Sequence, residues 1–216
     1  MKKRVAALIS GRGSNMTSLI AAAKDPAFPA EIALVLSNRP DAGGLETARK
    51  EGIASVAIDH KAYKSREEFE RAMQDVLLQH KIDIVCLAGF MRLLTPWFVE
   101  QWSGKMLNIH PAILPLYKGL HTHERALADG VKLHGATVHF VVPGMDEGPI
   151  IAQAVVPVLS TDTPETLGAR VLVQEHKIYP LALNLLAADR LSVDGTRVSI
   201  KGESAGEGAL IAPFIS

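Results

Sequence analysis

Predominantly apolar runs alternate with amphipathic segments through the first half of the chain. The apolar runs lie at residues 4–10, 31–38, 54–59 and 82–90. A strand that is covered on both faces needs apolar residues at most positions, so these runs predict buried parallel strands. Helical segments between them imply right-handed crossover connections. The pattern therefore predicts an α/β fold, a Rossmann-like, mostly parallel twisted sheet with helices on both faces.

The segments between these runs carry the periodicity of helices. Helices are predicted over residues 14–24, 44–52 and 65–81. Ser65 can cap the third of them, because its hydroxyl is able to accept a backbone N–H of the first turn. Acidic residues in that turn are also favourable beside the positive end of the helix dipole.

The second half of the chain changes character. A short strand at 106–110 and a helix at 121–130 precede two longer strands, at 135–142 and 149–158, which flank the turn "PGMDEG". The two longer strands can form a hairpin or lie as antiparallel edge strands beside the parallel sheet. The fold prediction therefore includes antiparallel strands in this half.

A long helix is predicted after Thr163, a candidate N-cap, with Pro164 in its first turn. The pattern continues to Pro180, where a kink or a break is expected because proline lacks a donor and clashes with the preceding turn. Residues 191–216 are rich in Gly and Ser without a strong period, so we expect a peripheral tail. No repeat or linker divides the chain, and residues 1–190 are expected to form a single domain.

Composition and charge narrow the class of protein. The 216 residues include 23 Lys and Arg and 23 Asp and Glu, so the formal net charge is zero. This charge gives no indication of binding to nucleic acid or an anionic membrane. The N-terminal apolar run is short, and no stretch is long enough to span a membrane, which favours a cytoplasmic location. The single cysteine, Cys86, excludes an intrachain disulfide and is expected to be a small buried hydrophobe.

A glycine-rich turn, "SGRGSNM", follows the first predicted strand. Such a turn before a helix aims backbone N–H groups and the positive helix dipole at one point. Gly11 and Gly13 let the backbone approach a phosphate, and Ser14 and Asn15 add side-chain donors. A dinucleotide fingerprint needs a third glycine where Met16 stands, and a Walker loop needs a Gly-Lys-Ser/Thr that is absent. The turn favours a phosphomonoester, with a tight turn that binds no ligand as the alternative.

Asn108 and His110 stand two residues apart at the end of a short predicted strand. Residues two apart on a strand point to the same side, and Pro111 ends the strand there. An amide N–H and an imidazolium N–H that converge suit an oxygen that gains negative charge, as in acyl transfer. Asp146, in a loop between two strands, could reach them, favour the charged form of His110 and relay a proton through water. A hydrogen-bonded structural histidine is the alternative.

Three other histidines offer weaker signals. His121 and His123 suggest a metal, but residues two apart at a helix start do not share a face, and the sequence supplies no further ligand set. No metal is therefore expected. His139 is either a buried partner of the site or a core histidine, and its alternation with Val138 and Phe140 favours the core.

Six sequence blocks resemble the phosphoribosylglycinamide formyltransferases, folate-dependent enzymes of purine biosynthesis. In chain order they are "ISGRGSN", "LAGFMRLL", "LNIHPAILP", "HGATVHFV", "DEGPII" and "QEHKIYP", within residues 4–187. The block "LNIHPAILP" with a downstream "DEG" belongs to the wider group of 10-formyltetrahydrofolate hydrolases and transferases. The early "SGRGSN" and the later "EHKIYP" favour the glycinamide member.

The resemblance implies a reaction and a set of site residues. The reaction is transfer of the formyl group of the co-substrate 10-formyltetrahydrofolate to the amine of glycinamide ribonucleotide. Asn108, His110 and Asp146 match the catalytic triplet. The residues expected to bind the ribonucleotide, mostly in the N-terminal half, are Gly11, Arg12, Gly13, Ser14, Asn15 and Glu175. The residues expected to bind folate, mostly in the C-terminal half with the catalytic groups, are Met91, Arg92, Leu93, Leu94, Val141, Val142, Pro143, Gly144 and Met145.

Two positions depart from the family pattern. Leu116 stands where many members carry a basic or small residue that would add a phosphate contact. Arg12 either adds positive charge near the phosphate or faces solvent.

Three other functions remain as alternatives. Formyltetrahydrofolate deformylase shares the triplet but carries an additional N-terminal domain, and methionyl-tRNA formyltransferase needs a C-terminal domain and a basic surface. Neither extra domain is expected here. A non-catalytic phosphate-binding module would need only the glycine-rich turn. The expected partners are small molecules, not nucleic acid or membrane, and the expected state is a monomer or a homodimer.

Overall fold

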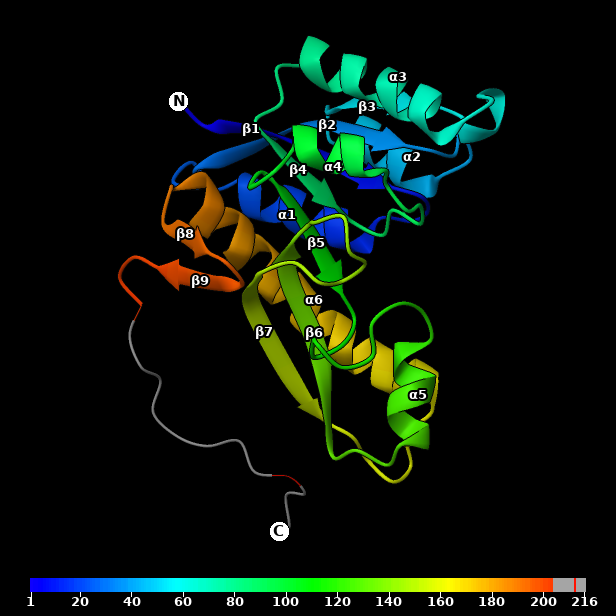
Figure 1. Ribbon diagram of the computed structural model, residues 1–216, viewed down its shortest axis with the longest axis vertical. Helices are drawn as coiled ribbons and strands as arrows, with labels where there is room; N and C mark the ends of the chain where they lie inside the picture. The colour runs from blue at the N-terminus through cyan, green and yellow to red at the C-terminus, as the bar shows by residue number, and fades with distance from the viewer. Residues whose placement is uncertain (204–211, 213–216) are drawn as a thin grey trace.

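One sheet of seven strands runs through the residues that the computed structural model describes, 1–203 and 212 (Figure 1). The strand order is β3-β2-β1-β4-β5-β6-β7. The parallel strands are β1 (Lys3–Ile9), β2 (Ala30–Ser37), β3 (Ala54–Ala57), β4 (Ile84–Leu87) and β5 (Met106–His110). The antiparallel strands are β6 (Leu133–Phe140) and β7 (Ile150–Pro157). The predicted α/β fold, with antiparallel strands in the second half, is confirmed.

Helices cover both faces of this sheet. They are α1 (Ser14–Ala23), α2 (Gly43–Lys50), α3 (Arg66–Gln79), α4 (Pro96–Gln101), α5 (Thr122–Ala128) and α6 (Pro164–Ala187), with a 3₁₀ turn, η1 (His60–Ala62). Residues of α1, α2 and α6 join one core, and residues of α3 and α4 join another. Helix α5 packs on α6 at the end of the molecule opposite to α3 (Figure 1). None of the described helices is long and apolar enough to cross a membrane.

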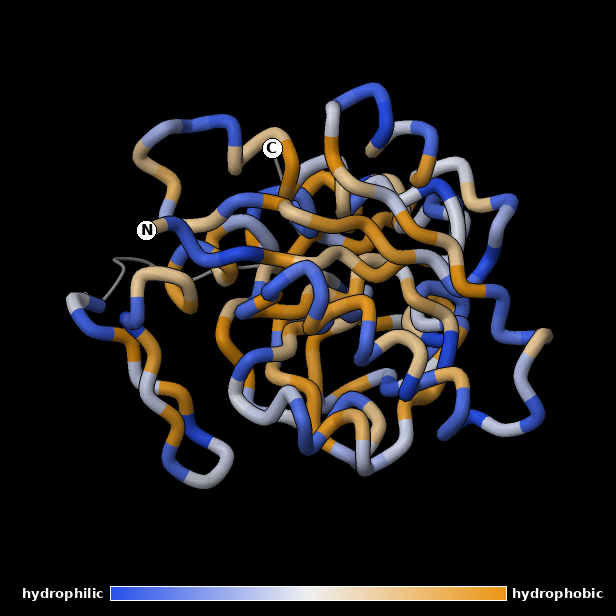
Figure 2. Tube along the Cα trace, turned by 90° about the horizontal axis from the view of Figure 1, so that it is seen from above, coloured by the Kyte–Doolittle hydropathy of each residue, from blue (hydrophilic) through white to orange (hydrophobic). Residues whose placement is uncertain are grey.

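Strand β1 shows why its sequence is continuously apolar. Val5, Ala7 and Ile9 face the core of α1 and α6, whereas Ala6 and Leu8 face the core of α3 and α4. All five side chains are fully buried, because helices cover both sides of the strand. Figure 2 shows the same distribution, with apolar strands inside and hydrophilic segments in the surrounding loops.

Cys86 lies in β4 with no exposed surface, as predicted. Burial raises the pKa of its thiol to about 12, so the thiol stays neutral at physiological pH. Cys86 therefore serves packing, not nucleophilic chemistry.

Capping side chains set the starts of several helices. Ser65 caps α3, as predicted, and Thr163 caps α6. Helix α4 is an element that the apolar pattern did not predict, although Thr95 caps it and Pro96 occupies its first turn. Six residues are too few to establish a helical period, whereas the capping pair is a usable local signal.

Of the kink or break expected at Pro180, the break does not occur, since α6 continues as one helix to Ala187. Proline removes one backbone hydrogen bond from a helix interior. Beyond it, Ala182, Leu183 and Leu185 are buried in the core. This burial outweighs the missing bond and keeps the last turns helical.

Residues 191–203, in the predicted tail, form a small separate sheet. Strands β8 (Leu191–Asp194) and β9 (Arg197–Ile200) make an antiparallel hairpin, and side chains of both are partly buried against the core. Two strands of four residues are too short to show a sequence period. The remainder of the tail, 204–211 and 213–216, lies outside the described residues.

Candidate functional site

The face of the sheet that carries α3 and α4 opens into a cavity at β5 and β6. On β5 the alternation of side chains places Met106, Asn108 and His110 on this face, and the core of α3 and α4 includes Met106. Next to it lies a cavity of about 620 Å³ whose lining includes Asn108 and His110. The two polar side chains therefore share a side, as the strand spacing predicts.

Asn108 is oriented by its neighbour across the strands. It pairs with His139 in the register of β5 and β6, and Asn108 Nδ2 lies 3.2 Å from His139 Nε2. His139 Nδ1 lies 2.8 Å from the carbonyl of Phe140, which can only accept, so Nδ1 carries the proton. Burial lowers the pKa of His139 and keeps the ring neutral, so its Nε2 accepts from the amide. The core interpretation of His139 is incomplete, because this buried ring also orients the site.

His110 has an oxygen beside each ring nitrogen. Its Nε2 donates to the carbonyl of Tyr117 at 2.9 Å, and its Nδ1 lies 3.4 Å from Asp146 Oδ2. The ring is buried, with 5% of the residue exposed. Because Tyr117 occupies Nε2, the atom that remains for a reacting group is Nδ1.

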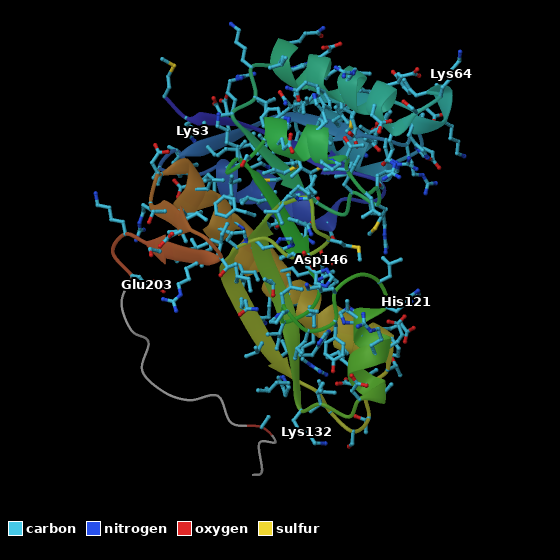
Figure 3. The ribbon with its side chains drawn as sticks, viewed as in Figure 1. Lys3, Lys64, His121, Lys132, Asp146 and Glu203 are labelled. Carbon is cyan, nitrogen blue, oxygen red and sulfur yellow. The ribbon has the colours of Figure 1, made fainter. Side chains whose placement is uncertain are left out.

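Asp146 completes a polar triplet with Asn108 and His110. Gly119 N–H donates to Asp146 Oδ2 at 2.8 Å, and Asp146 Oδ1 lies 3.7 Å from His139 Nε2. Figure 3 shows Asp146 near the middle of the molecule, between the part that carries α3 and the part that carries α5. The loop between β6 and β7 thus reaches the side chains of β5, and the triplet meets in one cavity.

A polar cluster of buried Thr137 and exposed Gln153 supports the chain just after His110. The Thr137 hydroxyl donates to the carbonyl of Ala112 at 2.7 Å and accepts from the N–H of Leu114 at 3.0 Å. Gln153 Nε2 donates to the carbonyl of Leu114 at 2.9 Å and to the Thr137 hydroxyl at 3.0 Å. Thr137 also pairs with His110 across the strands, so the cluster anchors the segment that leaves β5.

The glycine-rich turn lines a second cavity, of about 420 Å³, at the start of α1. Its members there are Gly11, Arg12, Gly13, Ser14 and Asn15. Gly13 has a φ of 71°, in the left-handed region that favours glycine. A Cβ on Gly11 would meet no atom within 4 Å, so its missing side chain leaves open space in the cavity. The first N–H groups of α1 lack intrahelical partners, which suits an anion.

Asn15 and Glu175 meet beside this turn. Asn15 Nδ2 donates to Glu175 Oε2 at 2.6 Å. Burial raises the pKa of the Glu175 carboxyl, against the lowering effect of the Asn15 hydrogen bond. Asn15 Oδ1 is buried and has no hydrogen-bond partner among the described residues. Glu175 is not among the residues lining the second cavity, so it adjoins that cavity through Asn15.

The nine residues expected to bind folate all line the first cavity. Met91, Leu93 and Met145 expose 71%, 62% and 53% of their surfaces, unusual values for large apolar residues that line one hollow. Gly89, Met91 and Arg92 line both cavities. The loop after β4 is therefore a wall that the two cavities share.

His121 and His123 point to separate partners. His121 Nδ1 lies 3.3 Å from a Glu124 carboxylate oxygen, and His123 Nδ1 lies 3.1 Å from His134 Nε2. Burial lowers the pKa of both His123 and His134, that of His134 to about 4. Within the described part of the chain no three His, Cys, Asp or Glu side chains gather as a metal site.

Tyr117, Gly119 and Thr137 support the triplet but lie outside the sequence prediction, whereas the sequence offers His139 as a partner of the site, second to a core role. Tyr117 and Gly119 act through backbone atoms, so their residue types carry no signal. Thr137 and His139 are polar residues two apart on an apolar strand, the same signal that singles out Asn108 and His110. Applied to β6, that spacing would have found the supporting side chains.

The sequence matches the formyl transferase family over residues 3–183. The phosphoribosylglycinamide formyltransferase of Escherichia coli (strain K12) is 44% identical over 210 residues, which cover 94% of this chain and 99% of that protein. The trifunctional purine biosynthetic protein adenosine-3 of Homo sapiens is 52% identical over 187 residues, which cover 87% of this chain and 18% of that protein. This chain thus spans less than a fifth of such trifunctional relatives.

Solved structures share the fold of most of this chain. Glycinamide ribonucleotide transformylase 1 from Symbiobacterium toebii is 45% identical with a TM-score of 0.90, and the match covers 93% of this chain and 94% of that one. The phosphoribosylglycinamide formyltransferase from Coxiella burnetii is 43% identical with a TM-score of 0.89, over 94% and 95% of the two chains. With its fold, its sequence and the length of its match in agreement, the chain belongs to the formyl transferase family.

Proposed function

We propose that this protein transfers the formyl group of 10-formyltetrahydrofolate to the amine of glycinamide ribonucleotide, giving formylglycinamide ribonucleotide and tetrahydrofolate. The main support is the convergence of Asn108, His110 and Asp146 in a largely apolar cavity that shares a wall with the cavity at the glycine-rich turn. The names of the bacterial relatives support the same substrates. We further propose that the protein is a cytoplasmic enzyme of purine biosynthesis. It would act as a monomer or a homodimer, and its partners would be small molecules.

The ribonucleotide phosphate would bind at the start of α1. The backbone N–H groups of Gly13, Ser14 and Asn15 supply donors, and the open space at Gly11 lets the phosphate approach closely. Glu175, held by Asn15, would accept a ribose hydroxyl. This arrangement directs the glycinamide amine along the shared wall toward the triplet.

Formylfolate would occupy the first cavity. A flat heterocycle with polar edges suits a hollow of apolar side chains between the backbone segments 91–94 and 141–146. Arg92 lines both cavities and would lie between the two substrates. The fit supports folate as the formyl donor.

The triplet supplies donors where negative charge develops. The amine attacks the formyl carbon, and the formyl oxygen becomes an oxyanion. Asn108 donates to it with the Nδ2 hydrogen that His139 does not accept, and protonated His110 donates through Nδ1. Both groups are held in place before reaction, so little reorganisation opposes the transition state.

Asp146 would stabilise the positive charge on His110 and carry the proton that the amine loses. Its carboxylate, 3.4 Å from His110 Nδ1, stabilises the imidazolium. As the new C–N bond forms, the amine loses a proton, which Asp146 accepts directly or through water. That proton passes to the folate nitrogen as its bond to the formyl carbon breaks, so charge balances over the reaction.

A product assay tests this function. The protein is incubated with 10-formyltetrahydrofolate, with and without glycinamide ribonucleotide, and tetrahydrofolate, formate and formylglycinamide ribonucleotide are measured. We expect equal amounts of tetrahydrofolate and formylglycinamide ribonucleotide, formed only with the acceptor. Formate released at the same rate without acceptor would instead identify a deformylase. Phosphate binding with neither product would identify a non-catalytic module.

A further inference from the structure

We propose that Arg125, an exposed residue of α5, is a positioning residue that holds the backbone of residues 117–120 against His110 and Asp146. Arg125 lies outside the lining of both cavities. This inference rests on the proposed function in one respect: the reaction whose rate Arg125 would change is formyl transfer. Its structural basis is independent of the substrate.

The segment 117–120 contacts the triplet through backbone atoms. The carbonyl of Tyr117 accepts from His110 Nε2 at 2.9 Å, and the N–H of Gly119 donates to Asp146 Oδ2 at 2.8 Å. One contact fixes the imidazole ring and the other fixes the carboxylate. A shift of this segment would therefore move both catalytic groups together.

Arg125 holds this segment from the solvent side. Its Nη1 donates to the carbonyl of Lys118 at 2.7 Å and to the carbonyl of Leu120 at 3.4 Å, the two carbonyls that flank Gly119. Its guanidinium carbon lies 5.4 Å from the centre of the Tyr117 ring, within the range of a cation–π contact. One side chain thus contacts the segment at the Lys118 carbonyl, the Leu120 carbonyl and the Tyr117 ring.

The segment needs such contacts because its backbone is strained at Tyr117. Tyr117 has a φ of 55°, in the left-handed region that is unfavourable for a bulky tyrosine, whereas the φ of 79° at Gly119 is unstrained for glycine. Lys118 adds an ion pair with Glu147 at 2.9 Å, but both side chains are exposed and such pairs contribute little. Arg125 differs from Lys118 in that its single side chain contacts Tyr117, Lys118 and Leu120 together.

Kinetics of Arg125→Ala test the proposal. We expect kcat for formyl transfer to fall about tenfold, because the catalytic groups lose alignment. KM for the ribonucleotide should stay within about twofold, since Arg125 contacts neither cavity. Arg125→Lys should recover part of the rate, because an ammonium can reach one carbonyl but lacks the guanidinium fork. Arg66→Ala, at an exposed arginine of α3, is the matched control and should change neither parameter.

A second readout does not depend on turnover. The His110 Nε2 proton, held by the Tyr117 carbonyl, is followed by ¹H–¹⁵N spectroscopy, and Arg125→Ala should speed its exchange with water about tenfold. If the parent only hydrolyses formylfolate, the proposed function fails, and the rate of hydrolysis together with proton exchange still tests Arg125. The proposal is overturned if kcat and proton exchange both stay at the parental values. A loss of rate that Arg125→Lys does not recover, accompanied by a lower Tm, would also overturn it.

Discussion

Asp146 illustrates how a backbone conformation delivers a side chain to the site. Its φ of 55° lies in the left-handed region, where aspartate is one of the better tolerated residues. Gly148 makes the same loop possible, since a Cβ there would overlap the carbonyl of Phe140. The carboxylate ends beside His110 while Gly119 fixes its orientation. Neither the turn nor the orientation is encoded by the aspartate alone.

Asp146→Asn separates the charge of this residue from its shape. Asparagine also tolerates the left-handed region, so the loop should keep its conformation. We expect kcat to fall by about 10²–10⁴, the range typical of general acid–base catalysis, with KM for both substrates little changed. The matched control is Asp189→Asn, an exposed aspartate with a φ of 53°. Steady-state kinetics check this, and a parental kcat in Asp146→Asn would refute the assigned role.

Glu175→Gln should make the protein more stable and weaken its binding of the ribonucleotide. Burial raises the pKa of Glu175 above its ordinary value of 4.5, so folding favours the protonated carboxyl. The free energy of unfolding therefore falls as the pH rises from 4.5 through the raised pKa, and stays lower above it. The amide has no charge to bury, so Tm should rise more at pH 8 than at pH 5. KM for the ribonucleotide should rise about tenfold through the loss of a charge-assisted hydrogen bond.

Calorimetry at both pH values and steady-state kinetics measure these effects. Glu165→Gln, on the same helix, is the control, because the Thr163 hydrogen bond lowers the pKa of that exposed carboxyl. It should not raise Tm at pH 8. A lower Tm at pH 8 in Glu175→Gln than in the parent would show that the ionised carboxylate stabilises the fold.

At the residue scale the sequence predicts side chains better than backbone contacts. Strand alternation brings Asn108 and His110 to one side, and the structure has them there. The contact between Asn15 and Glu175 joins residues far apart in the chain, so spacing could not reveal it. The carbonyl of Tyr117 could not be foreseen either, because any residue supplies a carbonyl.

At the element scale, the turn between β1 and α1 contains two glycines with different physical roles. Gly13 has a φ of 71°, and a Cβ there would meet the Met16 side chain at 3.3 Å. Gly11 has no such constraint, since a Cβ would find no atom within 4 Å. The fold therefore requires glycine at position 13, whereas only a bound ligand would require glycine at position 11.

Two alanine variants test this distinction. Gly13→Ala should lower the free energy of unfolding by about 1–2 kcal/mol, the cost of a left-handed L-residue. Gly11→Ala should keep the parental stability but raise KM for the ribonucleotide about tenfold, because the methyl group occupies space that the phosphate needs. Urea unfolding and kinetics on both variants check the prediction. Equal KM values for Gly11→Ala and the parent would show that the phosphate does not bind against Gly11.

The long periodic elements followed from the sequence, as did short strands that lie in apolar runs, such as β3 and β4. Strands with apolar runs and helices such as α3 have enough residues to establish a period. Helix α4 and the strands of the β8–β9 hairpin are too short for that, and tertiary packing decides them. Pro180 is the converse case, where buried contacts override a local signal to end the helix.

At the scale of the whole molecule, a change in strand direction creates the site. The first five strands are parallel, and crossover helices cover both of their faces. From β5 to β6 and β7 the connections are antiparallel, and the α3–α4 core ends at β5. The uncovered face becomes the first cavity, directly beside the second cavity at the glycine-rich turn that follows β1.

If formyl transfer depends on Asn108, His110 and Asp146 and substrate binding on other residues, removing one triplet side chain should slow the reaction without weakening binding. The most direct test is the single-turnover rate of formyl transfer by His110→Ala with both substrates saturating, together with the Kd of each substrate. We expect a rate about 10³-fold below the parent, with both Kd values nearly unchanged. His80→Ala, at the C-terminal end of α3, is the matched histidine control and should keep the parental rate. A parental rate in His110→Ala would show that formyl transfer does not depend on this side chain.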